Sequence, residues 1–113
     1  MLKIYHNPRC RKSRAALEYL SGKNISFEIR EYLKDPFTKT ELEEVLRKLG
    51  KSPFDIVRRQ EDIYKKKLKG KKLTREEWIE TLILNPKLIE RPLVVSNHKA
   101  VLGQPPENID KLL

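Results

Sequence analysis

The single cysteine of the chain, Cys10, has the sequence setting of a reactive thiol. It follows a segment predicted to be a strand and stands immediately before a segment predicted to be a helix. Free backbone N–H groups and the positive end of the helix dipole favour a thiolate at such a junction. Arg9, Arg11, Lys12 and Arg14 add positive charge nearby. Because the same N–H groups can bind an oxyanion, the pattern predicts a nucleophile of lowered pKa inside an anion site.

The residues around Cys10 argue against two common cysteine motifs. A phosphatase-type loop needs an arginine where this chain has Ala16, and a dithiol redox motif needs a cysteine where it has Ser13. The Ser13 hydroxyl can donate to the thiolate or belong to an ordinary first-turn residue. A lone cysteine forms no internal disulfide, so redox chemistry would take its second thiol from another molecule. An inert buried cysteine is the alternative interpretation.

A second candidate for the same site is Arg91, which precedes Pro92 and an apolar segment. A cis bond before Pro92 would bring the preceding backbone beside the helix N-terminus and direct Arg91 toward Cys10. A proline at the entry of a strand, next to a solvent-facing arginine, is the other interpretation.

The elements that must position these residues follow an α/β order. Residues 2–6 and the alternating segment 25–32 are predicted strands, and a helix between them runs from Cys10 to Gly22. Such a strand–helix–strand start favours a parallel pair with a right-handed crossover. The predicted order of the whole chain is β-α-β, then helices, then β-β-α.

The middle of the chain is predicted to be an all-helical insertion over approximately 38–84. Two capping-box patterns, Thr38 with Glu41 and Thr74 with Glu77, each precede apolar residues at helical spacing. After the insertion, segments 93–96 and 100–102 are predicted to form a hairpin, and a last helix follows from Pro105.

Length and charge limit the function classes. The chain has 113 residues, which suits one domain, and its 25 Lys and Arg exceed its 16 Asp and Glu by nine. Much of the excess lies in the lysine segment 65–72, which we interpret as a solvated loop. Long-range attraction of a small anion is another use of this charge. Nucleic-acid binding ranks well below because no accompanying motif is present. No apolar run reaches the ~20 residues of a membrane-spanning helix, and no signal peptide is visible, so we expect a cytoplasmic protein.

Four motifs, in order along nearly the whole chain, resemble the glutaredoxin-dependent arsenate reductases of the ArsC type, which are related to Spx-type regulators. The matching segments are His6–Arg14, Tyr32–Pro36, Arg91–Val95 and Gly103–Glu107. The resemblance implies a thioredoxin-like fold with a helical insertion, forming a single domain over residues 1–113. It also implies that a thiolate attacks arsenate, glutathione attacks the cysteine–arsenic ester, and glutaredoxin resolves the mixed disulfide as arsenite is released.

The resemblance carries over to individual residues. Cys10 matches the nucleophile, Arg91 matches one oxyanion-binding arginine, and Arg58 matches another, with Arg59 as a close rival. Gln104 stands where the reductases have a third arginine. A neutral glutamine can donate hydrogen bonds, but a charge-assisted bond is roughly twice as strong, so another small oxyanion is an alternative to arsenate as the natural substrate.

Two further residues, His6 and Ser13, are expected beside the nucleophile. His6 could tune the thiolate or be a strand-end histidine without a catalytic role.

We expect no metal and no bound cofactor, with glutathione as co-substrate, arsenate or another small oxyanion as substrate, glutaredoxin as partner, and a monomer. The alternative is an Spx-like regulator that binds a protein partner without arsenate turnover. Ser13 argues against it, because those regulators commonly use a cysteine pair, whereas the lysine segment 65–72 is the feature that would supply a partner surface.

Overall fold

The computed structural model describes residues 1–113, which group into two compact units. The first unit contains residues 1–35 and 91–113, and the second contains residues 36–90. The predicted insertion over 38–84 falls within the second unit, while the assignment of the whole chain to a single domain stays a prediction. No helix in the structure combines the length and the apolar character that a membrane crossing requires.

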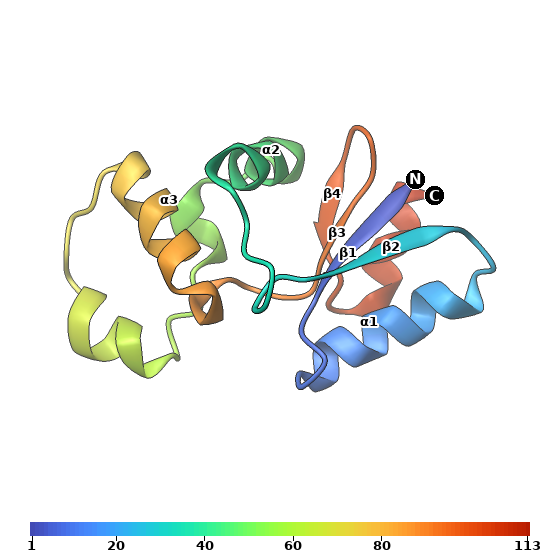
Figure 1. Cartoon of the computed structure of the whole chain (residues 1–113), viewed down its shortest axis with the longest axis horizontal. Coiled ribbons are helices and arrows are strands. Elements are labelled where there is room, and N and C mark those ends of the chain that lie inside the picture. The colour runs from blue at the N-terminus through green and yellow to red at the C-terminus, as the bar shows by residue number, and fades with distance from the viewer. The chain divides into compact units, whose positions relative to one another are not determined.

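The first unit is built on a four-stranded sheet of order β2-β1-β3-β4 (Figure 1). Its strands are β1 (Leu2–His6), β2 (Phe27–Glu31), β3 (Leu93–Val95) and β4 (Ala100–Leu102). The parallel pair β1–β2 is connected through helix α1 (Arg11–Gly22), whereas β3 pairs antiparallel with both β1 and β4. The predicted β-α-β start and the predicted hairpin are therefore confirmed.

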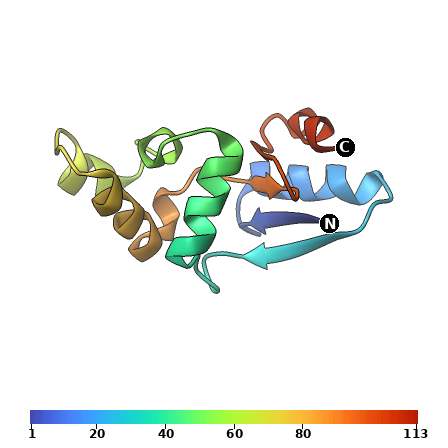
Figure 2. The same ribbon diagram turned by 90° about the horizontal axis from the view of Figure 1, so that it is seen from above.

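One face of this sheet carries the core of the first unit. Helix α1 and the C-terminal 3₁₀ helix η4 (Pro106–Leu112) lie on the same side of the strands (Figure 2). Alternate strand residues and residues on one stripe of α1 point to the same cluster, as the two periodicities require. The buried members are Leu2, Ile4, Ala16, Leu20, Val94 and Ile109.

Two segments differ from the prediction. The strand predicted over 25–32 is shorter, because the chain turns at Asn24, whose φ is 56°, and β2 starts only at Phe27. Ile29, an apolar residue of the predicted alternating segment, is 51% exposed on β2, which is an edge strand. The lysine segment is not entirely a loop: Tyr64–Leu68 forms a turn of π-helix (η2), although its lysines are exposed as expected.

The second unit is mostly helical. Its elements are α2 (Lys39–Leu49), η1 (Pro53–Ile56), η2, α3 (Arg75–Leu84) and η3 (Pro86–Leu88). Buried side chains from α2 and α3, Leu42, Val45, Leu46, Ile79 and Leu82, contribute to its interior. The Phe54 ring packs against Trp78 with their centroids 5.3 Å apart. The prediction of a wholly helical insertion misses one antiparallel bridge, between Val57 and Ile89.

The capping box at the start of α2 gives a testable stability contribution. Thr38 Oγ1 accepts from the Glu41 N–H at 3.1 Å, and the Glu41 carboxylate accepts from the Thr38 N–H at 2.9 Å. We expect Thr38→Ala to lower the free energy of unfolding by about 1 kcal/mol, because one backbone N–H loses its partner. Urea denaturation measures this change. Thr40→Ala, at an exposed position in the first turn of the same helix, is the matched control. An equal loss in both variants would contradict the capping role.

Candidate active site

The topology of the sheet brings three predicted site segments to one edge. Tyr5 pairs with Leu93, and Leu93 pairs with Leu102, so the end of β1, the start of β3 and the end of β4 lie in one row. The Cys10 turn follows β1, the Arg91 segment precedes β3, and Gln104 follows β4. Residues far apart in the sequence are therefore presented at the same end of the first unit.

The turn before Cys10 is fixed by its own hydrogen bonds. The Asn7 carbonyl accepts from the Cys10 N–H, and the Asn7 side-chain oxygen accepts from the Arg9 N–H, each at 3.0 Å. Arg14 donates from Nη1 to the Pro8 carbonyl at 2.9 Å. Asparagine and proline are typical of such turns, because one bonds the local backbone and the other fixes φ. The turn therefore delivers Cys10 to the start of α1.

Cys10 is the N-cap residue of α1, in extended backbone conformation, and is 8% exposed. The first turn of the helix has no acidic residue and begins with Arg11 and Lys12. Cations at a helix N-terminus oppose the helix dipole, whereas an anion there is stabilised. The sequence of this turn is thus suited to a thiolate or a bound oxyanion.

Arg91 contacts the cysteine directly. Its Nε donates to Cys10 Sγ at 3.1 Å, and the Arg91–Pro92 peptide bond is cis. The interpretation of Arg91 as a solvent-facing residue is therefore wrong for this structure: its guanidinium lies against the thiol. A charge-assisted donor at this distance favours the ionised sulfur.

The surroundings of Cys10 act on its pKa in opposite directions. Burial raises the pKa, but the backbone N–H groups of Ser13 and Lys12 and the Arg91 guanidinium lower it by more in total. The pKa of the thiol therefore lies below its ordinary value. A cysteine that is buried yet contacts a cation and a helix N-terminus differs from an inert core cysteine, whose pKa burial alone would raise.

His6 and Ser13 form a buried pair behind the turn. His6 Nδ1 and Ser13 Oγ are 2.7 Å apart, and Ser13 Oγ also accepts from the Asn7 N–H at 2.9 Å. The exposed fractions of the two residues are 5% and 0%. With the hydroxyl accepting from Asn7, its own proton can be donated to His6 Nδ1, which suits a neutral imidazole. The pair holds the Cys10 turn against the end of β1.

The protonation of His6 predicts a pH dependence of stability. Burial has the largest effect and lowers the pKa of His6; Glu31, its partner on β2, raises the pKa by a smaller amount, and Arg14 has the smallest effect and lowers it. Between the lowered native pKa and the ordinary value of ~6.5, the imidazole therefore holds more of its proton in the unfolded chain than in the native protein, so the contribution of His6 to stability is lost as the pH falls through this window.

The measurement is the free energy of unfolding of wild type and His6→Asn across this pH range. Asparagine retains an acceptor for Ser13 but does not titrate, so its stability curve should be flatter than that of wild type. His98→Asn, at an exposed histidine, is the control. Parallel curves for wild type and His6→Asn would contradict a buried neutral imidazole.

The contacts of the remaining predicted residues lie within their own units. Gln104 is exposed, and its side chain forms no hydrogen bond, although its carbonyl accepts from Asn108 Nδ2 at 3.2 Å. Arg58 lies in the second unit, where Nη1 contacts a Glu61 carboxylate oxygen at 2.8 Å and Nε is buried without a partner. Arg59 is exposed and lies over the Phe54 ring, 4.3 Å from its centroid. The oxyanion roles of Arg58 and Gln104 stay predictions.

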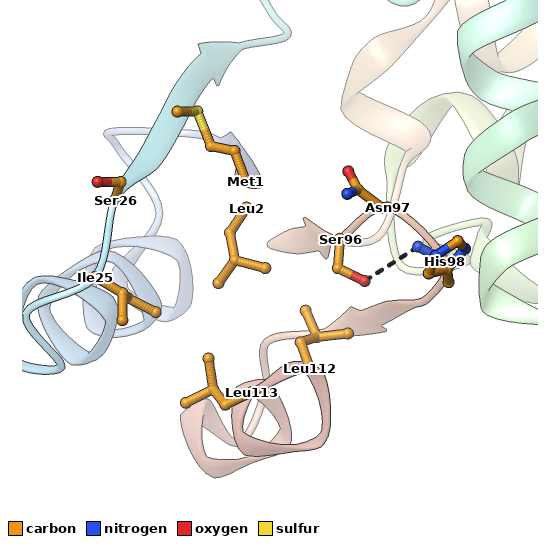
Figure 3. Close-up of a pocket in the computed structure, with 9 residues that line it drawn as sticks. All are labelled: Met1, Leu2, Ile25, Ser26, Ser96, Asn97, His98, Leu112 and Leu113. Atoms are coloured by element: carbon orange, nitrogen blue, oxygen red, sulfur yellow. Dashed lines mark hydrogen bonds between the residues drawn. The ribbon is translucent and has the colours of Figure 1, made fainter.

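A pocket of about 390 Å³ lies elsewhere in the first unit (Figure 3). Its lining residues are Met1, Leu2, Ile25, Ser26, Ser96, Asn97, His98, Leu112 and Leu113. Leu2 begins β1, whereas the Cys10 turn follows the other end of that strand. The pocket therefore contains none of the predicted site residues.

Sequence reasoning missed three residues that lie against predicted site residues or their segments. Glu31 faces His6 only because of the β1–β2 register, which no local pattern reveals. Glu61 pairs with Arg58 at a spacing of three residues, which the sequence does show. Gly103 begins the Gly103–Glu107 motif, but its close contacts depend on tertiary packing, which the sequence does not show.

The fold and the site define a class of protein: a thioredoxin-like α/β protein with a helical insertion and one cysteine at a helix N-terminus. Residues 5–112 match the ArsC family, and the chain belongs to that family. An uncharacterized protein of Escherichia coli (strain K12), YfgD, is 43% identical over 110 residues, covering 96% of this chain and 92% of the relative.

Two further comparisons agree with this assignment. An arsenate reductase of Neisseria meningitidis (serogroup A, strain Z2491) is 40% identical over 114 residues, covering 99% of this chain and 97% of the relative. The solved structure of an arsenate reductase from Vibrio cholerae superposes with a TM-score of 0.93 at 35% identity, covering 99% of this chain and 97% of that one. The thioredoxin-like fold that the motifs implied is thereby confirmed.

Proposed function

We propose that this protein is a thiol-dependent oxidoreductase that reduces arsenate, or a closely similar small oxyanion, through Cys10. The observation that carries the proposal is the 3.1 Å contact between Arg91 Nε and Cys10 Sγ at the N-terminus of α1. This arrangement supplies an ionised nucleophile and oxyanion donors at one place. Similarity to proteins named arsenate reductase supports arsenate as the first substrate to test.

The reaction we propose has three balanced steps. Cys10 sulfur attacks arsenic, an oxygen of arsenate leaves as water, and a cysteine–arsenic(V) ester forms. Glutathione thiol then forms a disulfide with Cys10 as the sulfur–arsenic bond breaks, and the two electrons of that bond remain on arsenic, which leaves as arsenite. A glutaredoxin thiol takes the glutathione from Cys10 by thiol–disulfide exchange, which restores the free cysteine. With one cysteine in the chain, both other thiols come from outside.

The other residues have supporting roles in this proposal. The Arg91 guanidinium stabilises the thiolate and can then bind an arsenate oxygen, and Arg58 is the second oxyanion-binding arginine that the resemblance to the arsenate reductases implies. Gln104, with an exposed and unpartnered side chain, offers a neutral donor. We propose a monomer in the cytoplasm, without metal or bound cofactor, where glutathione and glutaredoxin provide the reducing equivalents.

The test is arsenite formation by the purified protein with arsenate, glutathione and glutaredoxin. We expect turnover to require all three, and omission of glutaredoxin to leave one glutathione on Cys10. Absence of arsenite at every arsenate concentration, while oxidised glutathione still adds glutathione to Cys10 by thiol–disulfide exchange, would show a reactive thiol acting on a different substrate. Absence of both arsenite and adduct would contradict the proposal.

A second candidate function is an Spx-like regulator that binds a protein partner, favoured by the exposure of six lysines within 65–72. Capture from cell extract distinguishes the two functions when the bait is Cys10→Ser. RNA polymerase is the kind of partner that the resemblance to Spx-type regulators implies. Recovery of its subunits by this thiol-free bait, together with no arsenite formation by wild type, would favour regulation. Loss of that recovery when the six lysines are replaced by glutamine would assign the binding to the lysine segment.

A further inference from the structure

Gly103 is the one glycine of the chain whose neighbours leave no room for a Cβ atom. A Cβ at Gly103 would lie 2.9 Å from Pro92 Cγ and 3.2 Å from Ala16 Cβ. The other glycines differ: Gly50 and Gly70 have φ values of 68° and 82°, and a Cβ at Gly22 would meet nothing within 4 Å. Gly103 does not adopt a left-handed conformation, so close packing is the reason for glycine here.

The two nearest of the three neighbours of Gly103 belong to the two segments that form the thiol site. Pro92 directly follows Arg91, which donates to Cys10 Sγ at 3.1 Å. Ala16 lies in α1, and Cys10 caps that helix. The backbone at Gly103 therefore lies between the segment that carries the guanidinium and the helix that carries the sulfur.

Hydrogen bonds hold Gly103 in this position. Its N–H donates to the Pro92 carbonyl at 2.8 Å, which extends the β3–β4 pairing by one residue. Asn108 Nδ2 donates to the carbonyl groups of Leu102 at 3.0 Å and Gln104 at 3.2 Å, on either side of Gly103. With Ala16 and Pro92 both buried, an added methyl group can be accommodated only by moving one segment away from the other.

We propose that Gly103 is a positioning residue: by lacking a side chain, it sets the spacing between the Arg91–Pro92 segment and α1, and so keeps Arg91 on Cys10. Gly103 does not touch the reacting atoms, and its effect acts through Arg91. The effect of this spacing on the Cys10 thiol does not depend on the substrate. Only the expected effect on the rate of arsenate reduction rests on the proposed function.

The test compares Gly103→Ala with Gly22→Ala, which makes the same change in open space. The readout is the pH dependence of the Cys10 thiolate, followed by ultraviolet absorbance and by the rate of alkylation. We expect Gly103→Ala to raise the pKa of Cys10 toward its ordinary value and Gly22→Ala to leave it unchanged. If arsenate is the substrate, kcat/KM should fall by up to about 100-fold in Gly103→Ala, as small misplacements of reacting groups can cause.

A wild-type thiol titration in folded Gly103→Ala would overturn the inference. If Gly103→Ala does not fold, Asn108→Ala replaces it, because this variant keeps glycine but frees the two carbonyl groups that flank it. An unchanged thiol pKa in Asn108→Ala would then overturn the inference, and a raised pKa would support it. Failure of arsenate turnover in wild type, with these shifts in the thiol pKa present, would overturn the proposed substrate and leave the positioning role intact.

Discussion

Replacing Cys10 by serine should abolish arsenate reduction while leaving the fold intact. Serine is close to cysteine in size, but its hydroxyl does not ionise near neutral pH and forms no disulfide with glutathione. Because Cys10 is the only cysteine, no other thiol in the chain can replace it. We expect the rate of arsenite formation to fall by at least about 1,000-fold, as loss of a sole nucleophile does in other enzymes. The assay contains arsenate, glutathione and glutaredoxin, and its product is quantified as arsenite.

Two controls make this result specific. Unfolding of Cys10→Ser should occur within about 1 kcal/mol of wild type, because the substitution nearly conserves volume. Wild type incubated with arsenate and glutathione should gain the mass of one glutathione on Cys10, and the variant should gain none. Turnover by Cys10→Ser at the wild-type rate would show that the reaction does not pass through this sulfur.

The frame of the site could be predicted from the sequence because local patterns specify it. The capping boxes at Thr38 and Thr74 and the strand–turn–helix around Cys10 each depend on neighbouring residues, and the structure has them where they were expected. The return of the chain to the sheet after the insertion followed from apolar segments and the turn at residues 97–98. Such features combine propensity with hydrophobic periodicity, which single sequences display directly.

What the sequence could not specify are contacts set by tertiary packing. The pairing of His6 with Glu31 depends on a strand register, and the exposure of Ile29 depends on which strand lies at the sheet edge. The sequence does not distinguish an Arg91 side chain that reaches the thiol from one that faces solvent, because the same Arg-Pro pair is compatible with both orientations. The 3.1 Å contact of Arg91 with Cys10 separates the two, and it does so across 81 positions of sequence.

The same contact predicts the largest effect of any residue outside the nucleophile. Arg91→Ala removes both the charge and the hydrogen bond that favour the Cys10 thiolate. The pKa of the thiol should rise, so that at neutral pH a smaller fraction is ionised and reactive. A hydrogen bond to a charged group contributes about 1.5–3 kcal/mol, which corresponds to a fall in kcat/KM of roughly 10- to 160-fold.

Arg91→Lys separates the charge from the geometry. Lysine keeps a positive charge but replaces the planar guanidinium with a flexible ammonium, so its thiol pKa and its kcat/KM should lie between those of wild type and Arg91→Ala. Arg47→Ala, at an exposed arginine that pairs with Glu44 in α2, is the control for loss of one positive charge. Both substitutions remove one positive charge, but only Arg91→Ala removes a contact with the thiol. If Arg47→Ala lowered kcat/KM and raised the thiol pKa equally, Arg91 would act through the overall charge of the protein. If Arg91→Ala retains the wild-type thiol titration, the lowered pKa must come from the helix N-terminus alone, and Arg91 would have no part in activating the sulfur.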